Sequence, residues 1–374
     1  MKTEAEKINN ELTPRTTGAM YNIVKLARNA RHWCYCRLFR TPVDILITCS
    51  ISVLLIQFVP KVFAWLTWNS VVFWGDPQLC TDEGACWPFL REKIRLILFG
   101  TYPFSEQWRP ALACILLLSL VGLSFTRLLR LRSTVVVWTI GSIAFFVLMR
   151  GGNLGLIEVD SIQWNGLPVL LMLSIFSVIG AFPIGILLAL GRFQKEDPVL
   201  KSMAVGYIEI VRGVPMVMVL FMGLFILPLM LPKGMNLNSL YTTLIVLVFF
   251  HAAYFAEGIR GGLQALPKGQ YEAAQSQGLT YWQTMRFVIL PQALKRSMPG
   301  NMNTLLGAYK DTSLVVILGI HDIMATAKMA YSEPQWQQYG VEAYLLVALW
   351  YFCTCLCLST YSRKLETTES KIAK

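Results

Sequence analysis

The chain has 374 residues, of which 55% are hydrophobic and only 15% are charged, and its mean hydropathy is +0.51. This composition excludes an ordinary soluble domain, in which about a quarter of the residues are charged. The net charge of +11 does not indicate nucleic acid as a partner, because the basic residues lie in short loops between apolar runs. That distribution is typical of a membrane protein whose basic loops remain on the inner side.

The first segment, residues 1–42, is polar and basic, and it shows no small-residue cleavage site after an apolar core. It therefore lacks the pattern of a cleavable signal peptide. Two structures fit this predicted cytoplasmic tail equally well. One is a basic amphipathic helix over Met20 to Phe39 on the inner membrane surface, and the other is a disordered tail whose charges orient the first span.

A helix needs about 20 apolar residues to cross the hydrocarbon core of a bilayer. Eight runs approach this length, so we predict an all-α fold, a polytopic transmembrane helical bundle of about eight spans. The runs are Val43 to Leu66, Trp108 to Phe125, Thr134 to Met149, Leu167 to Leu190, Ile208 to Leu231, Leu240 to Ala256, Met298 to Ile320 and Val341 to Tyr361. Pro183 and Pro215 interrupt the fourth and fifth runs, and a proline inside a helix bends or breaks it.

The loops after the second, fourth and sixth runs are basic, like the tail before the first run. Their basic residues are Arg127, Arg130, Arg132, Arg192, Lys195, Lys201, Arg260, Lys268, Arg286, Lys295 and Arg296. The alternate loops are more acidic and carry Asp76, Asp82, Glu83, Glu158 and Asp160. Because basic loops stay inside, both termini are predicted to be cytoplasmic.

Two of the nine cysteines, Cys80 and Cys86, lie in a predicted outer loop. An oxidising compartment would allow a disulfide between them. Their spacing does not determine the geometry of a bond, so two unpaired thiols are the alternative. The remaining cysteines lack the four-ligand spacing of a metal site, and the sequence predicts no metal.

Lys310 and Asp311 fall near the middle of the seventh run, followed by Thr312 and Ser313. A charge at this depth is costly, so it is expected to be paired or to face a polar cavity. In the first interpretation these four residues line a substrate pathway, in which Asp311 receives an ammonium group and Lys310 a carboxylate. In the second, the two charges pair with other helices and hold the bundle together.

Two further pairs of opposite charge stand three residues apart near the inner ends of the fifth and sixth runs. They are Glu209 with Arg212, and Glu257 with Arg260. Residues at this spacing share a helix face. We predict that both pairs close a gate or lock neighbouring helices together.

The polar loop, Pro267 to Pro291, separates the sixth and seventh runs. Pro267 suits the first turn of a helix, good helix formers follow, and Gly278 supplies the permissive backbone that ends it. The short helix would present two small residues, Ala273 and Ala274, beside the acidic Glu272. A second helical stretch leads to Pro291. Such a segment is too short to bury itself, so we expect it to dock against a partner.

The chain has no G-x-x-x-x-G-K-[ST] motif for binding nucleotide phosphates, and neither G-x-S-x-G nor H-E-x-x-H occurs. The protein is therefore not expected to be an enzyme. If the charged residues of the seventh run line a transport pathway, the energy must come from a partner chain or from an ion gradient.

The polar loop resembles the EAA signature of permease subunits of ABC importers. The resemblance rests on Glu272, Ala273, Ala274 and Gly278 and on a Val-Ile-Leu-Pro run that ends at Leu290 and Pro291. A wider similarity to polar amino-acid permeases covers Leu167 to Tyr361. It includes the segments EIVRGVP from Glu209, AYFAE from Ala253 and KDTSL from Lys310. Segments of the outer loop resemble the M-type permease of general L-amino-acid importers.

This resemblance implies a five-span permease core over 167–361, with a cytoplasmic coupling region at 257–297. It also implies a three-span extension over 43–166 with a periplasmic loop at 67–107, and a cytoplasmic tail at 362–374. Expected partners in the bacterial inner membrane are a second permease, of the Q type, an ABC ATPase dimer that carries ATP and Mg, and a periplasmic amino-acid-binding protein. The chain itself would bind no cofactor, and membrane lipid would surround it.

A rival function is that of an ion-coupled secondary amino-acid carrier that works without an ATPase. Such carriers are built from inverted repeats with discontinuous helices in matching halves. The two halves of this chain show no self-similarity, which favours the importer subunit. A non-transporting sensor or scaffold is a third possibility, and it would need no polar residues facing a pathway in mid-membrane.

Overall fold

The computed structural model describes residues 38–126, 131–152, 155–194, 197–232 and 238–372. Most of the predicted tail, residues 1–42, therefore lies outside the described residues. The chain divides into two compact units. The first comprises residues 1–71 and 78–85, and the second comprises residues 72–77 and 86–374.

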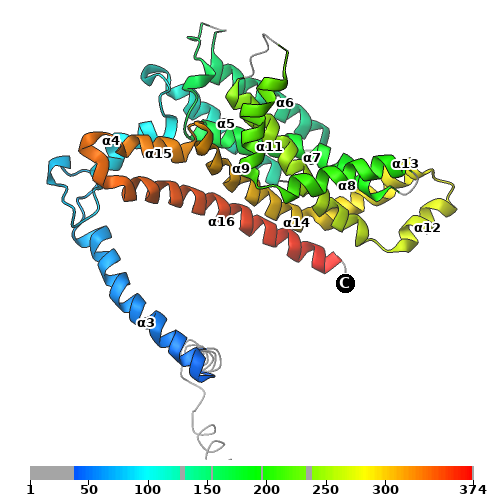
Figure 1. The fold of residues 1–374 in the computed structure, drawn as a ribbon, viewed down its shortest axis with the longest axis horizontal. Coiled ribbons are helices and arrows are strands. Elements are labelled where there is room, and N and C mark those ends of the chain that lie inside the picture. Colours follow the sequence, from blue (N-terminus) through cyan, green and yellow to red (C-terminus); the bar gives the residue numbers. More distant parts are fainter. Residues whose placement is uncertain (1–37, 127–130, 153–154, 195–196, 233–237, 373–374) are drawn as a thin grey trace, which may run out of the picture. The chain divides into compact units, whose positions relative to one another are not determined.

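The elements are helical along the chain (Figure 1). The α-helices are α3 (Pro42–Phe63), α4 (Trp87–Phe99), α5 (Trp108–Phe125), α6 (Leu131–Arg150), α7 (Leu167–Phe193), α8 (Pro198–Gly213), α9 (Met216–Phe221), α10 (Leu227–Met230), α11 (Ser239–Gln264), α12 (Lys268–Ser276), α13 (Tyr281–Gln283), α14 (Leu290–Asp311), α15 (Ile323–Tyr331) and α16 (Gly340–Ile372). Short 3-10 or π segments are η1 (Ala64–Trp68), η2 (Pro77–Leu79), η3 (Phe104–Glu106), η4 (Ser161–Gln163), η5 (Met222–Ile226), η6 (Thr284–Ile289), η7 (Thr312–Leu318) and η8 (Pro334–Tyr339).

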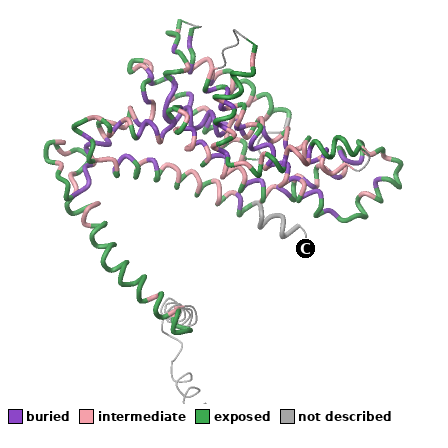
Figure 2. The backbone as a smooth tube through the Cα atoms, viewed as in Figure 1, coloured by how far each residue is buried: buried purple, intermediate pink, exposed green. Residues whose placement is uncertain are grey.

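The first unit is dominated by α3, whose start is set by local chemistry. Thr41 and Asp44 form a reciprocal capping box, in which the Asp44 amide donates to Thr41 Oγ1 at 3.1 Å and the Thr41 amide donates to Asp44 Oδ2 at 3.0 Å. The helix is strongly apolar, yet it has no buried residue (Figure 2). An apolar surface exposed on every side requires an apolar surrounding, which a lipid bilayer supplies.

The core of the second unit is the contact between α7 and α11, and α14 packs against α11 and also touches α7. Glycines bring these helices close. A Cβ added at Gly185 of α7 would lie 2.8 Å from Phe255 Cβ, and one at Gly262 of α11 would lie 2.4 Å from the Ala293 carbonyl oxygen of α14. Small residues at helix contacts are the usual means by which membrane helices pack.

Six helical segments of the described chain are long and apolar enough to cross a membrane. The bent pair of α8 and α9 to α10 would make a seventh, with an angle of 107° between its halves. The break lies at Val214 and Pro215, as the sequence predicted, whereas α7 continues through Pro183 as one helix. The predicted run from Met298 to Ile320 corresponds to the end of α14 and to η7, where charged residues lower the hydropathy.

The later part of the predicted extension belongs to the same compact unit as the predicted core. Residues 86–166 belong to the same compact unit as α7 to α16. The helix α4 packs on α15, where Thr326 Oγ1 donates to the Ile97 carbonyl at 2.6 Å. At its start, the Cys86 amide donates to Glu342 Oε1 at 3.0 Å. At the other end of the chain, the predicted tail 362–374 begins inside α16.

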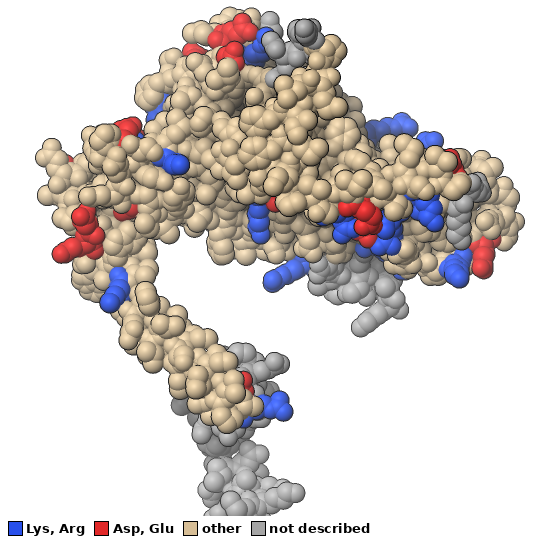
Figure 3. All heavy atoms as spheres, in the orientation of Figure 1, with Lys and Arg blue, Asp and Glu red and all other residues tan. Residues whose placement is uncertain are grey.

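The cysteines differ in state. Cys80 and Cys86 are disulfide-bonded, and the free thiols among the described residues belong to Cys49, Cys114, Cys353, Cys355 and Cys357. The visible surface of the second unit is largely uncharged, and acidic and basic side chains form small groups on it (Figure 3). This sparse charge agrees with a surface that is mostly in contact with lipid.

A buried carboxyl group outside the candidate spans is the N-cap of α15. Asp322 is fully buried, and its Oδ1 accepts from the amides of Met324 and Ala325 at 3.1 and 3.0 Å. Its Oδ2 is buried and has no hydrogen-bond partner in the described chain. Burial raises the pKa of Asp322 from its usual value of 3.8 to about 7. The folded protein therefore keeps this proton at pH values where the unfolded chain has lost it.

We predict that Asp322 makes the protein less stable as the pH rises. A raised carboxyl pKa gives stability that is complete below the unfolded pKa and is lost as the pH approaches the folded pKa, here between about 4 and 7. The melting temperature of the detergent-solubilised protein should fall across this window. In Asp322→Asn, whose amide oxygen still caps α15, the fall should be smaller. Equal slopes in the two proteins would contradict the prediction.

Candidate functional site

A cavity of the second unit lies between α8, α9, α11 and α14 and has a volume of about 700 Å³. Its charged and polar lining comes from three helices. Arg212 lies in the last turn of α8, His251 and Tyr254 lie on α11, and Asn303, Thr304 and Asp311 lie on α14. The break between α8 and α9 forms one wall, through Gly213 to Met216. A cavity with both an acidic and a basic group in its wall suits a ligand that carries both charges.

Asp311, the last residue of α14, is held by a histidine. His251 Nε2 lies 3.3 Å from Asp311 Oδ2, and the His251 side chain is only 2% exposed. The other ring nitrogen, Nδ1, is buried and has no hydrogen-bond partner among the described residues. Because the histidine is enclosed by the packing of α11, it restricts the orientation of the carboxylate, whose side chain is 35% exposed.

The other three predicted pathway residues are placed differently. Lys310 is exposed and does not line the cavity, since adjacent residues on a helix point about 100° apart. Thr312 is buried and donates to the Tyr309 carbonyl at 2.8 Å. Ser313 donates to the Lys310 carbonyl at 2.9 Å. Both hydroxyl groups are thus bonded to their own helix, and Asp311 alone of the four reaches the cavity.

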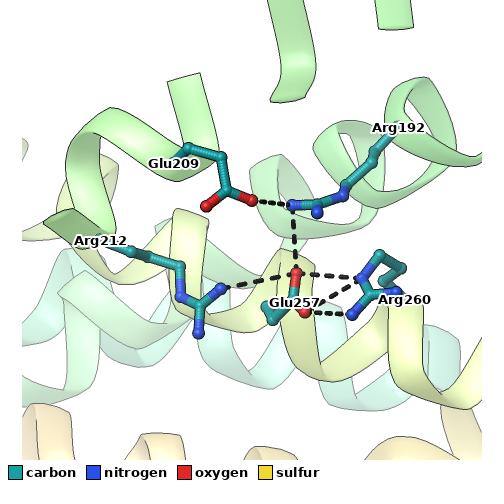
Figure 4. Close-up of polar contacts among 5 residues, drawn as sticks. All are labelled: Arg192, Glu209, Arg212, Glu257 and Arg260. Atoms are coloured by element: carbon teal, nitrogen blue, oxygen red, sulfur yellow. Dashed lines mark hydrogen bonds and ion pairs between the residues drawn. The ribbon is translucent and has the colours of Figure 1, made fainter. Parts of the chain in front are cut away.

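The four residues predicted to form gate pairs belong to one network with Arg192 of α7 (Figure 4). Glu257 of α11 is its centre. Arg260 Nε donates to both oxygens of Glu257 at 3.0 Å, and Arg260 Nη2 makes a further bond. Arg192 Nη1 lies 3.3 Å, and Arg212 Nη1 3.6 Å, from Glu257 Oε2. The network therefore joins α7, α8 and α11.

The pairing within this network differs partly from the predicted one. Glu257 and Arg260 pair along their helix as expected. Glu209 instead pairs with Arg192 at 2.9 Å, and no ion pair joins it to Arg212 in the described chain. Spacing along α8 permits a pair with Arg212, but packing of α7 against α8 brings a closer guanidinium to Glu209.

Two groups of the site, Arg192 and His251, are not among the site residues predicted from the sequence. Arg192 counts there only among the basic residues of the loops, although it lies in the last turn of α7. The signal of His251 was present in the sequence, because a histidine in the middle of an apolar run is one of the few polar groups at that depth.

The polar loop begins with α12, preceded by Pro267 as the N-cap. Gly278 has a φ of +74°, the left-handed conformation that favours glycine, and a Cβ there would meet no atom within 4 Å. Glu272 and Ala273 are exposed, whereas Ala274 is buried. The predicted second helical stretch is formed by α13 and η6, which run into α14 at Leu290, with Leu290 half-buried and Pro291 exposed.

The polar loop is anchored at its base and exposed at its turn. The Tyr271 ring stacks on Phe193 of α7 at 6.1 Å, and its hydroxyl donates to the Leu263 carbonyl of α11 at 3.3 Å. Arg296 Nη1 of α14 donates to the Ala265 carbonyl at 2.6 Å. The loop is thus attached to three helices at its base, and the residues around Gly278 at its turn are exposed.

Comparison with known proteins identifies a family for this combination of bundle, cavity and loop. Residues 181–367 match the family described as the inner membrane component of binding-protein-dependent transport systems. The chain is 38% identical over 336 residues to the inner membrane amino-acid ABC transporter permease protein YhdY of Escherichia coli K12, covering 89% of this chain and 91% of that protein.

Two other proteins are similar. The glutamate/glutamine/aspartate/asparagine transport system permease protein BztC of Rhodobacter capsulatus is 35% identical, with coverage of 78% of this chain and 80% of that protein. A solved structure, described as an amino acid ABC transporter with histidines, is 31% identical and has a TM-score of 0.47, covering 55% of this chain and 92% of its own.

The match covers half of the chain, and the relatives align with it over most of their length. Permease subunits of this kind have no ATPase site of their own, so ATP hydrolysis belongs to a partner chain, and the system includes a binding protein. An ion-coupled carrier acting alone is therefore excluded. The chain belongs to the family of multi-pass inner membrane permease subunits of binding-protein-dependent ABC importers.

Proposed function

We propose that this subunit imports polar or general L-amino acids, and that the ligand passes through the cavity bounded by α8, α11 and α14. The observation that carries the proposal is Asp311, an acidic group at the wall of a cavity within an apolar bundle. An amino acid brings an ammonium group that can pair with this carboxylate. The names of the similar permeases support amino acids as the class of ligand.

His251 fixes the orientation of the Asp311 carboxylate, which is the proposed acceptor for the ammonium group. A carboxylate that is free to rotate loses conformational entropy when it binds a ligand, whereas one already held pays less of that cost. The 3.3 Å contact between His251 Nε2 and Asp311 Oδ2 leaves the other carboxylate oxygen available to the cavity. The polar side chains of Asn303 and Thr304 on the same helix provide further hydrogen-bonding groups.

The polar loop would dock on a dimer of ATPase chains, which carry the ATP and Mg that this subunit does not bind. Its exposed residues around Glu272, Ala273 and Gly278 are the proposed contact. Leu290 and Pro291, the first residues of α14, connect the loop to the rest of that helix. Closure of the ATPase dimer would then move α11 and α14, because both helices hold the base of the loop.

The proposed orientation places both termini and the polar loop in the cytoplasm, following the distribution of basic residues. A periplasmic amino-acid-binding protein would then deliver the ligand at the opposite side. The second permease is proposed to be a Q-type homologue. The exposed apolar surface of α3 and α16 is available to lipid or to this second subunit.

Reconstitution tests the function directly. The subunit is purified with its ATPase, second permease and binding protein and is placed in liposomes with a panel of labelled L-amino acids. Uptake should require ATP hydrolysis and the binding protein. Accumulation driven by a proton or sodium gradient alone, without ATP, would overturn the proposal.

Asp311→Asn should reduce amino-acid uptake by about tenfold or more, because the neutral amide cannot form the charge-assisted bond to an ammonium group. The complex should still assemble, since Asp311 pairs only with His251 among the described residues. Lys310→Gln is the matched control, since Lys310 is the neighbour that lies outside the cavity, and it should retain uptake. Normal uptake by Asp311→Asn would remove the proposed role.

Gly278→Asp should uncouple ATP hydrolysis from uptake. Asparagine and aspartate both tolerate the left-handed backbone, so the variant should fold, but its charge would enter the docking surface unpaired and weaken the contact by about tenfold or more. Gly278→Asn serves as the neutral control of equal size and should keep more of the coupling. If both variants transport at the wild-type rate, Gly278 is not part of the docking surface.

A further inference from the structure

We propose that Arg212 binds the carboxylate of the transported amino acid, and that ligand and Glu257 compete for its guanidinium group. This inference rests on the proposed function, because it assigns a binding partner to the carboxylate of the same ligand whose ammonium group pairs with Asp311. It differs from the expectation drawn from the sequence, in which Lys310 received the carboxylate and Arg212 belonged to a gate.

Arg212 has unused hydrogen-bonding capacity at the cavity wall. A guanidinium group has five N–H donors in a planar fork that matches a carboxylate. Among the described residues, Arg212 makes no side-chain hydrogen bond. Its contacts are the ion pair to Glu257 at 3.6 Å and the ring of Tyr254, whose centroid is 5.7 Å away. Its side chain is 35% exposed and lines the cavity.

Glu257 does not depend on Arg212 for its own neutralisation. Arg260 occupies both oxygens of Glu257 through hydrogen bonds at 3.0 Å, and Arg192 makes a closer ion pair than Arg212 does. Three guanidinium groups in this network share two carboxylates, so one positive charge is in excess (Figure 4). Arg212 is the most loosely held of the three and is the one that faces the cavity.

The cavity also carries a negative charge, which can bind the ammonium group of the ligand. Asp311 on α14 suits the ammonium group and Arg212 on α8 suits the carboxylate, so both charges of an α-amino acid would be neutralised inside the bundle. Lys310 cannot take this role in the same cavity, because it does not line it. The side chain of the ligand would then contact the walls formed by Phe250, Tyr254 and Asn303.

Competition for Arg212 also links the ligand to the helices. Arg212 lies in the last turn of α8, two residues before the break at Val214 and Pro215, and Glu257 lies on α11, which leads into the polar loop. When a ligand carboxylate takes the guanidinium, the tie between α8 and α11 at this point is lost. A ligand in the cavity therefore weakens the contact between α8 and α11.

The first experiment compares a ligand with its α-amide. Binding of a labelled L-amino acid, chosen as one that the reconstituted complex takes up, is measured on the purified permease–ATPase complex without binding protein, and the α-amide of the same amino acid is used as competitor. Wild type should bind the free acid about tenfold or more tightly than the α-amide. The neutral amide cannot accept the two charge-assisted hydrogen bonds that a guanidinium group donates to a carboxylate. Arg212→Lys and Arg212→Gln should lose most of this preference.

The second experiment tests the competition. Glu257→Gln removes the competing carboxylate and should tighten binding of the free acid by about two- to fivefold, with no tightening for the α-amide. Glu209→Gln is the matched control, because Glu209 pairs with Arg192 and makes no ion pair with Arg212 in the described chain. It should bind the acid as wild type does. Complexes are compared only after gel filtration shows intact assembly.

The outcomes separate this inference from the proposed function. If no amino acid binds or is taken up by wild type, the proposed function itself fails. If amino acids bind but the α-amide binds equally well, Arg212 does not recognise the carboxylate. If the acid is preferred and Arg212→Gln keeps that preference, another group recognises it. If Glu257→Gln binds the acid no more tightly than Glu209→Gln does, ligand and Glu257 do not compete.

Discussion

The charge of Glu257 is the constraint on which the arrangement of this bundle depends. An unpaired carboxylate among apolar helices is costly, so the helices that bring guanidinium groups to it must stay close together. Arg260 comes from the same helix, but Arg192 and Arg212 come from α7 and α8. Packing between apolar surfaces has no such directional requirement, and this network therefore determines how the ends of three helices meet.

Two of these helices also connect the cavity with the polar loop. The helix α14 has 22 residues, about 33 Å of length, with Leu290 at one end and Asp311 at the other. The helix α11 carries His251 and Glu257 and ends three residues before Pro267. In the proposed function, a displacement of the loop would reach the cavity along these two helices. Rigid-body motion of packed elements would then be sufficient to couple an ATPase to the ligand.

Much of the fold and part of the site could be predicted from the sequence. Seven of the eight apolar runs, the break near Pro215 and the helix–turn–helix of the polar loop depend on residues close in sequence, and the described part of the structure has all of them. The choice of Lys310 as a cavity residue depends on which face of α14 meets α11. The sequence places Lys310 and Asp311 at the same depth, but the helix points them in different directions.

Length and hydropathy determined by themselves that the chain crosses a membrane repeatedly, because backbone groups in lipid must be bonded within each helix. The residue type alone determined that Gly278 follows the end of a short helix, since this requires only local backbone freedom. The tertiary structure decided which charges meet. Arg192 is 65 residues away from Glu257 in sequence, and it becomes a partner only because α7 packs on α11. Charge pairing between helices depends on their relative rotation, which no local pattern encodes.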